Sequence, residues 1–207
     1  MTTITRPQYR QVDAGAPDLL ALAEAAACLR AGGLVIFPTE TVYGVGVHAD
    51  NPEAVTRLYE AKARPSDKQL TWHVATTEQA RRLPLEWPAV AVELARNFWP
   101  GPLTLVLKRR EGSETVGVRV PRHLVAAAFL TMAHVPVVAS SANRSGQPPA
   151  TTAEAAAQAL GEQVDFIVDA GPATMGEPST VVDCTVNPPA MLRAGARARE
   201  IERVWTR

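Results

Sequence analysis

Helix-like and strand-like patterns alternate along this chain. Over residues 18–30, Leu22, Ala26 and Leu29 lie on one face of a predicted helix, which Gly32-Gly33 ends. Helical spacing also predicts helices that start after Asn51 and that cover 88–98, 123–131 and 152–160. Short apolar runs predict strands over 34–37, 70–74, 103–107, 115–120, 135–139, 166–168, 180–182 and 190–193.

This alternation predicts an α/β protein with an open, twisted sheet flanked by helices. The predicted strands 103–107 and 115–120 follow each other without an intervening helix, so we expect a mixed sheet rather than a purely parallel one. Neither an internal repeat nor an interdomain linker is visible, and residues 10–200 are expected to form a single domain. The polar tail after Arg193 is expected to cover a sheet edge or to fray.

The composition is that of a globular protein and does not identify a ligand. The chain has 207 residues, of which 46% are hydrophobic, and its 21 basic residues balance 21 acidic ones. Net charge therefore indicates neither nucleic acid nor membrane, although a local basic patch remains possible.

Cys28 and Cys184 fit no metal or disulfide pattern, so they are expected to be buried small side chains. An apolar signal core and any run of about 20 apolar residues are absent, which predicts a cytoplasmic protein without a membrane partner.

Two cations follow the helix that starts after Asn51. Lys62 and Arg64 are two residues apart, and Pro65 favours an extended backbone at Arg64. Such a segment could direct both side chains at one phosphate or carboxylate. The alternative is a solvated helix end, stabilised by the helix dipole.

Other polar groups follow predicted strands. The turn 140–146 is rich in Ser and Asn, and could bind phosphate or sugar oxygens or only its own backbone. Thr39 and Thr41 flank Glu40 directly after a buried strand, and in an extended segment Glu40 would face away from both. Arg119 lies in a valine-rich strand, so it is either on an exposed face or needs an anionic partner.

Known catalytic spacings are missing from the chain. The sequence contains neither of the glycine-rich nucleotide motifs GxxxxGK[ST] and GxGxxG. It also lacks HExxH, GxSxG and zinc-ligand spacings, which disfavours metalloprotease and acyl-enzyme chemistry. His73, alone in a predicted strand, is more typical of a satisfied core histidine than of a ligand.

Seven motifs together resemble the YrdC-like threonylcarbamoyl-AMP synthases, in the order of that family and over about residues 15–195. The KxR and SxN elements are the hallmark of the family. The matching segments are Pro38–Gly46, Lys62-x-Arg64-Pro65, Trp99-Pro100-Gly101-Pro102-Leu103-Thr104, Val118-Arg119-Val120-Pro121, Ser141-Ala142-Asn143-x-Ser145-Gly146, Ser179–Asp183 and Leu192-Arg193.

The resemblance implies a YrdC-like fold around a deep, positively lined cavity. It implies that L-threonine, bicarbonate (or carbon dioxide) and ATP give threonylcarbamoyl-AMP and pyrophosphate, with Mg²⁺ carried by ATP and no protein metal site. The product would feed threonylcarbamoyladenosine formation in tRNA through a separate transferase complex, and binding of RNA or tRNA by the chain itself is possible.

The resemblance also implies roles for individual residues. It makes Lys62, Arg64, Ser141 and Asn143 the catalytic, nucleotide-binding core. Further nucleotide contacts would be Lys68, Thr115 and Arg193, and the threonine and bicarbonate pocket would contain Thr39, Thr41, His73, Arg119 and Ser179.

The chain departs from the family pattern at three points. Gln69 stands where a proline is common after Lys68, and Pro149-Ala150 stands where a serine-proline is common. The chain also resembles the short form of the family, without the extra C-terminal domain. Two rival interpretations stay open: a non-catalytic double-stranded RNA or tRNA module, and a carbamoyl-adenylate-forming domain.

Overall fold

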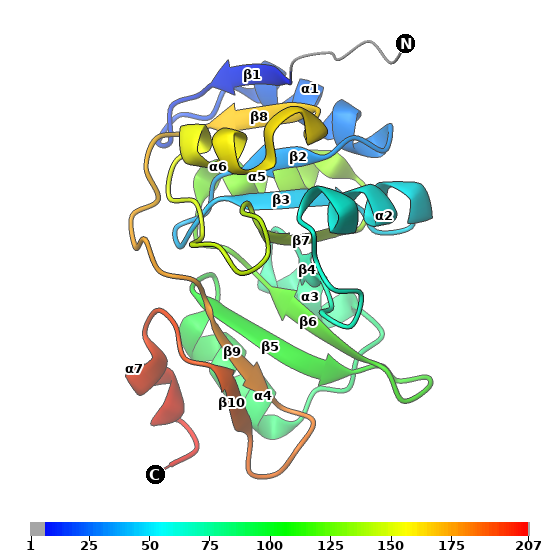
Figure 1. Ribbon diagram of the computed structural model, residues 1–207. Helices are drawn as coiled ribbons and strands as arrows, with labels where there is room; N and C mark the ends of the chain where they lie inside the picture. The colour runs from blue at the N-terminus through cyan, green and yellow to red at the C-terminus, as the bar shows by residue number, and fades with distance from the viewer. Residues whose placement is uncertain (1–6, 207) are drawn as a thin grey trace.

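A computed structural model describes residues 7–206 of the chain (Figure 1). These residues form one 10-stranded sheet in the order β1-β8-β2-β3-β7-β4-β6-β5-β9-β10. The strands are β1 (Gln8–Gln11), β2 (Val35–Phe37), β3 (Gly44–His48), β4 (Thr71–His73), β5 (Leu103–Lys108), β6 (Thr115–Arg119), β7 (Val137–Ser141), β8 (Phe166–Asp169), β9 (Thr180–Asp183) and β10 (Ala190–Arg193). The helices are α1 (Leu19–Arg30), α2 (Pro52–Ala61), α3 (Thr77–Arg82), α4 (Ala89–Phe98), α5 (Leu124–Ala133), α6 (Ala153–Leu160) and α7 (Ala198–Glu202), with a 3₁₀ turn η1 at Gly161–Gln163.

The sheet is mixed, which confirms the predicted fold class. Strand β8 runs parallel to both β1 and β2, and β4–β6 and β5–β9 are parallel pairs. The hairpin-like pairs β2–β3 and β5–β6 are antiparallel. The second of these is the pair that the helix-free connection predicted.

Helices cover both faces of the half of the sheet formed by β1, β8, β2, β3 and β7 (Figure 1). On one face, α1 and α5 bury Leu22 and Phe129 against Phe37 of β2. On the other face, α2 and α6 pack Leu58 and Leu160 against the opposite side chains of β2 and β3. Strands buried on both faces need apolar residues throughout, which explains the unbroken run 34–37.

The other half of the sheet, from β4 to β10, buries one face against α4. Leu105 of β5 and Val118 of β6 pack there against Leu94 and Phe98. The intervening residues of the same strands, such as Thr104 and Gly117, are small or polar and point to the opposite face. That second face forms the floor of a cavity.

The two halves of the sheet meet at a short ladder between β4 and β7. Thr71, Trp72 and His73 pair antiparallel with Ala139, Val138 and Val137. Farther along the chain, the segment from β8 to β9 crosses from one half to the other (Figure 1).

Among the strands and α-helices, four were not predicted: β1, β3, α3 and α7. Strand β3 starts with two spaced glycines, which are unusual in strands. A Cβ at Gly44 or Gly46 would come within 3.0 or 3.1 Å of the Phe37 ring, so the glycines make room for that ring. The tail after Arg193 does not fray, because α7 buries Ile201 completely in the core beside α4.

Both cysteine thiols keep their protons at neutral pH. Cys184 is buried and Cys28 is half-buried, and burial raises their pKa values to about 12 and about 11. None of the helices within residues 7–206 has the length and apolar character needed to cross a membrane.

Candidate active site

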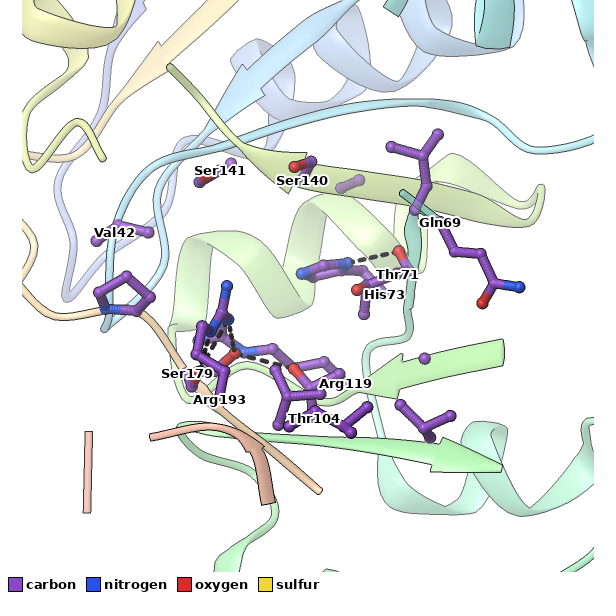
Figure 2. A pocket seen from close by; sticks show the side chains of 18 of the residues that line it. Val42, Gln69, Thr71, His73, Thr104, Arg119, Ser140, Ser141, Ser179 and Arg193 are labelled. Atoms are coloured by element: carbon purple, nitrogen blue, oxygen red, sulfur yellow. Dashed lines mark hydrogen bonds between the residues drawn. The ribbon is translucent and has the colours of Figure 1, made fainter. Parts of the chain in front are cut away.

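A cavity of about 420 Å³ lies on the helix-free face of the sheet, beside the β4–β7 ladder. Figure 2 shows side chains from both halves of the sheet around it, among them Ser141 above and Arg119 and Arg193 below. Of the residues predicted for the site, eight line this cavity: Thr39, Arg64, His73, Thr115, Arg119, Ser141, Ser179 and Arg193. The other four, Thr41, Lys62, Lys68 and Asn143, do not line it.

Three arginines from distant segments converge on the cavity. Arg64 donates from Nε and Nη2 to the carbonyls of Lys68 and Gln69, at 2.9 and 2.8 Å. Arg193 donates from the same two atoms to the carbonyl of Ser179, at 3.0 and 2.8 Å. Burial, then the charges of Arg119 and Arg64, lower the pKa of Arg193, so Arg193 lies within the fields of the other two cations.

The lining is therefore cationic, though not uniformly so. Asp67 and Asp183 also reach the cavity, and Asp183 is turned toward its own loop by hydrogen bonds from Thr185. Arg64 and Arg193 are held by neutral carbonyls, which leaves their charges uncompensated by a carboxylate at those bonds. An arrangement of this kind suits a ligand with several negative charges.

Arg119 is buried and paired, which decides between the two alternatives for this strand. Its Nη2 donates to Glu40 Oε1 at 3.0 Å and to Thr41 Oγ1 at 2.6 Å. Glu40 and Thr41 therefore both face the guanidinium group of Arg119. The prediction that Glu40 would face away from Thr41 is wrong, because the backbone bends at these residues. Thr39 Oγ1 lies 2.9 Å from Thr41 Oγ1 and completes this polar group.

Lys62 lies beneath the Ser/Asn turn instead of pointing into the cavity. Its Nζ donates to the carbonyls of Ser141 and Asn143, and the residue is only 1% exposed. Burial, reinforced by the charge of Arg64, lowers the pKa of Lys62 to about 8. The two cations diverge because Ala63 has a φ of +47°, which turns the chain between them.

Asn143 braces the same turn from within. Its Nδ2 donates to the carbonyls of Arg144 and Gln147 at 2.9 and 2.7 Å. The amide of Ser145 in turn donates to the carbonyl of Lys62 at 2.8 Å. Lys62 and Asn143 thus fix the shape of the turn that brings Ser141 to the cavity. Lys68 is exposed, and its carbonyl is the acceptor for Arg64.

His73 is a neutral member of the lining. Its Nδ1 lies 3.0 Å from the carbonyl of Thr71, so Nδ1 carries the hydrogen and Nε2 is an acceptor. Burial, with a further contribution from the charge of Arg119, lowers the pKa of His73 to about 3. The ring meets Phe37 edge-on at 5.9 Å, and Figure 2 shows it beside Thr71 on the cavity floor.

Sequence reasoning missed Thr104, which forms part of the floor. Its Oγ1 lies 2.9 Å from Ser179 Oγ, and Arg193 Nη2 reaches the same serine hydroxyl at 3.1 Å (Figure 2). The alternation of large and small residues over Leu103–Leu107 was the available signal, because it separates a core face from a cavity face.

The departures from the family pattern fall in two different environments. Gln69 lines the cavity and accepts a hydrogen bond from Arg64 through its carbonyl, a bond that a proline carbonyl could equally accept. Ala150 is buried in the core beside α2 and α6, and its carbonyl accepts the amide of Tyr43.

Comparison with known families decides the relationship. The family model Sua5_yciO_yrdC, described as "Telomere recombination", matches residues 27–195. The chain belongs to the Sua5/YciO/YrdC family.

Several curated relatives of the family carry a named activity. The Threonylcarbamoyl-AMP synthases of Pyrococcus abyssi and Bacillus subtilis are 44% and 43% identical, over 87% and 86% of this chain. The chain spans little more than half of their length, 56% and 54%. A relative from Mycobacterium leprae, the "Putative threonylcarbamoyl-AMP synthase", is 40% identical, and the match covers 88% of this chain and 87% of the relative.

Solved structures of the family share the fold described above. P. abyssi Sua5 complexed with L-threonine superposes with a TM-score of 0.87 at 40% identity, covering 97% of this chain and 61% of that one. E. coli YciO gives a TM-score of 0.83 at 25% identity, with 92% and 96% covered. HypF of T. kodakarensis, at 22% identity and a TM-score of 0.71, shows a shared fold alone.

Proposed function

We propose that this chain is a threonylcarbamoyl-AMP synthase. It would join L-threonine and bicarbonate (or carbon dioxide) to the AMP portion of ATP, releasing pyrophosphate. Residues 10–200 would act as a single catalytic domain. The product would pass to a separate transferase complex that modifies tRNA, in the cytoplasm.

The convergence of Arg64, Arg119 and Arg193 on one cavity carries this proposal. A triphosphate supplies several negative charges, and an amino acid supplies one carboxylate, so the two ligands together match three cations. Arg64 and Arg193 would bind phosphate oxygens, because neutral carbonyls hold them and leave their charge available. Arg119, already paired with Glu40, would bind the singly charged carboxylate of threonine.

The remaining residues supply oriented hydrogen bonds. Ser141, with the backbone of its turn, would bind phosphate oxygens, and Thr115 would contact the nucleotide. The hydroxyls of Thr39 and Ser179 and the neutral imidazole of His73 would surround threonine and its carbamate. Lys62 and Asn143 would contribute by fixing the turn.

The proposed reaction depends on the positioning of its substrates more than on proton transfer by side chains. The neutral amine of threonine would take up carbon dioxide to form a carbamate and release one proton. A carbamate oxygen would then form a bond to the α-phosphorus of ATP as the bond to the β-phosphate oxygen breaks, and pyrophosphate would leave. Arginines beside the triphosphate stabilise the charge that builds on the leaving oxygens.

Magnesium would enter as part of the ATP complex. Within residues 7–206, His, Cys, Asp and Glu form no cluster of three or more that could hold a metal ion. Asp67 is the acidic side chain nearest in sequence to Arg64 that lines the cavity, and it could bind water around that ion.

The test is release of pyrophosphate from ATP in the presence of bicarbonate, with and without L-threonine. The proposal expects release that depends on threonine and an AMP adduct of matching mass. Release that requires a carbamoyl donor in place of threonine and bicarbonate would point to carbamoyl-adenylate formation. RNA binding without any ATP turnover, and unaffected by Arg64→Met, would replace the enzyme with a binding module.

A further inference from the structure

Glu40 is a buried carboxylate to which the proposed mechanism gives no task. It is 4% exposed, it does not line the cavity, and it lies between two threonines that belong to the site. Its backbone carbonyl accepts hydrogen bonds from the amide of Met175 and the hydroxyl of Thr174, at 2.8 and 3.2 Å. Its side-chain Oε2 is buried without a hydrogen-bond partner among residues 7–206, and burying a carboxylate is costly, so the contact of Oε1 with Arg119 has to compensate for this cost.

The ion pair with Arg119 indicates that role. Glu40 Oε1 and Thr41 Oγ1 both accept from the same nitrogen, Nη2 of Arg119, at 3.0 and 2.6 Å. The two acceptors therefore fix one edge of the guanidinium group. Arg119 Nε is buried and has no hydrogen-bond partner among residues 7–206, although Arg119 itself lines the cavity. A donor left over in this way can be satisfied by a ligand.

The charge of Glu40 also affects which ligand Arg119 attracts. Arg193 is close enough to both Arg119 and Arg64 for their charges to act on it. The carboxylate of Glu40, 3.0 Å from Arg119, offsets part of its positive charge, whereas Arg64 and Arg193 donate to neutral carbonyls. A polyphosphate is thereby favoured at Arg64 and Arg193, and Arg119 is left for a ligand of lower charge.

We infer that Glu40 is a positioning residue that orients Arg119 and reserves it for the carboxylate of the amino-acid substrate. Glu40 itself does not touch the substrate. The inference rests on the proposed function for the identity of that substrate.

The test compares Glu40→Gln, which keeps the size and one acceptor oxygen, with Glu60→Gln as the matched control on the exposed surface of α2. Titration calorimetry measures the binding of L-threonine and of ATP separately. We expect Glu40→Gln to weaken threonine binding by about 10- to 100-fold and ATP binding by less than about threefold. Glu40→Asp, which retains the charge, should restore part of the threonine affinity.

A second measurement follows the guanidinium group directly. In ¹⁵N spectra, the Nη2–H signal of Arg119, assigned with Arg119→Lys, should be protected from exchange in the wild-type protein and lost in Glu40→Gln, because Nη2 is the nitrogen that donates to Glu40. Threonine affinity at the wild-type level in Glu40→Gln would overturn the inference. So would equal losses for threonine and ATP with a lower melting temperature, since that pattern describes a purely structural glutamate.

These outcomes separate the inference from the proposed function. If the wild-type protein binds no threonine, the proposed function fails, and the Arg119 signal alone then decides about Glu40. A signal that persists unchanged in Glu40→Gln would refute the orienting role, and its loss would support it.

Discussion

Replacing Lys62 by methionine should separate the stability of the fold from the activity of the site. Methionine has a similar length and removes only the ammonium group. That group donates to the carbonyls of Ser141 and Asn143 and lies outside the cavity. The turn that brings Ser141 to the cavity would lose its anchor, while the cavity would keep all three of its arginines.

The magnitude follows from two opposing contributions. Two hydrogen bonds from a charged donor stabilise the fold by about 3–6 kcal/mol in total. The fall of the Lys62 pKa from 10.5 to about 8, caused by burial and then by the charge of Arg64, corresponds to a cost of about 3 kcal/mol for keeping the charge there, which the substitution removes. We therefore expect Lys62→Met to lower the free energy of unfolding by about 0–3 kcal/mol, and to lower threonine-dependent pyrophosphate release by about a hundredfold.

The pH dependence of stability provides a sharper signature. A lysine whose folded pKa lies below its unfolded value binds its proton less tightly in the folded state. Stability should therefore rise as pH increases from about 8 toward 10.5, and this rise should be missing from Lys62→Met. Denaturant titrations at pH 7.5 and 9.5 measure this rise in the free energy of unfolding. The rise should be about 2 kcal/mol larger in the wild-type protein than in Lys62→Met.

Lys108→Met is the matched control, because Lys108 is a half-exposed cation of β5 that pairs loosely with Glu86 at 3.7 Å. It should leave both turnover and the pH dependence unchanged. Wild-type turnover in Lys62→Met, or an identical rise in stability with pH, would refute the anchoring role of Lys62.

Three further substitutions test other parts of the site. Arg193→Met should raise the KM for ATP about 10- to 100-fold in the pyrophosphate assay, and an unchanged KM would remove Arg193 from the nucleotide site. Because the pKa of His73 is lowered in the folded protein, protonation favours the unfolded chain, and stability should fall between pH 6.5 and pH 4. His73→Asn should make this fall smaller. Thermal melts with the same pH profile for both proteins would contradict this. Gly117→Val should weaken ligand binding by at least tenfold in calorimetry, since even a Cβ there would lie 3.2 Å from Thr71 Oγ1 and the extra methyl groups would enter the cavity floor; unchanged affinity would show that ligands do not approach that strand.

The sequence predicted the fold well where each element has its own local signal. The helix-free step between 103–107 and 115–120 correctly indicated a mixed sheet, and Asn51 does cap α2 through its side chain. Strand β3 was not predicted, because its glycines are explained by the Phe37 ring and the β7 side chains on the neighbouring strands. Contacts between segments that are distant in sequence leave no such local trace.

The site shows the same limit more clearly. Residue types and the family resemblance singled out Arg64, Arg119 and Arg193, all of which line the cavity. The spacing of Lys62 and Arg64 suggested a common target, and the positive φ of Ala63 is the reason that the two side chains part. The sequence did not indicate the partner of Glu40, because only the folded chain places its carboxylate against an arginine 79 residues away.

The short ladder between β4 and β7 has a mechanical consequence for the cavity. The wall with Ser141 belongs to one half of the sheet, and the wall with Arg119 and Arg193 belongs to the other. Only three paired residues of β4 join these halves along the sheet, so a small change of twist there alters the separation of the walls. A ligand that bridges both walls would act as a cross-brace, and its binding should register as slower amide exchange along this ladder.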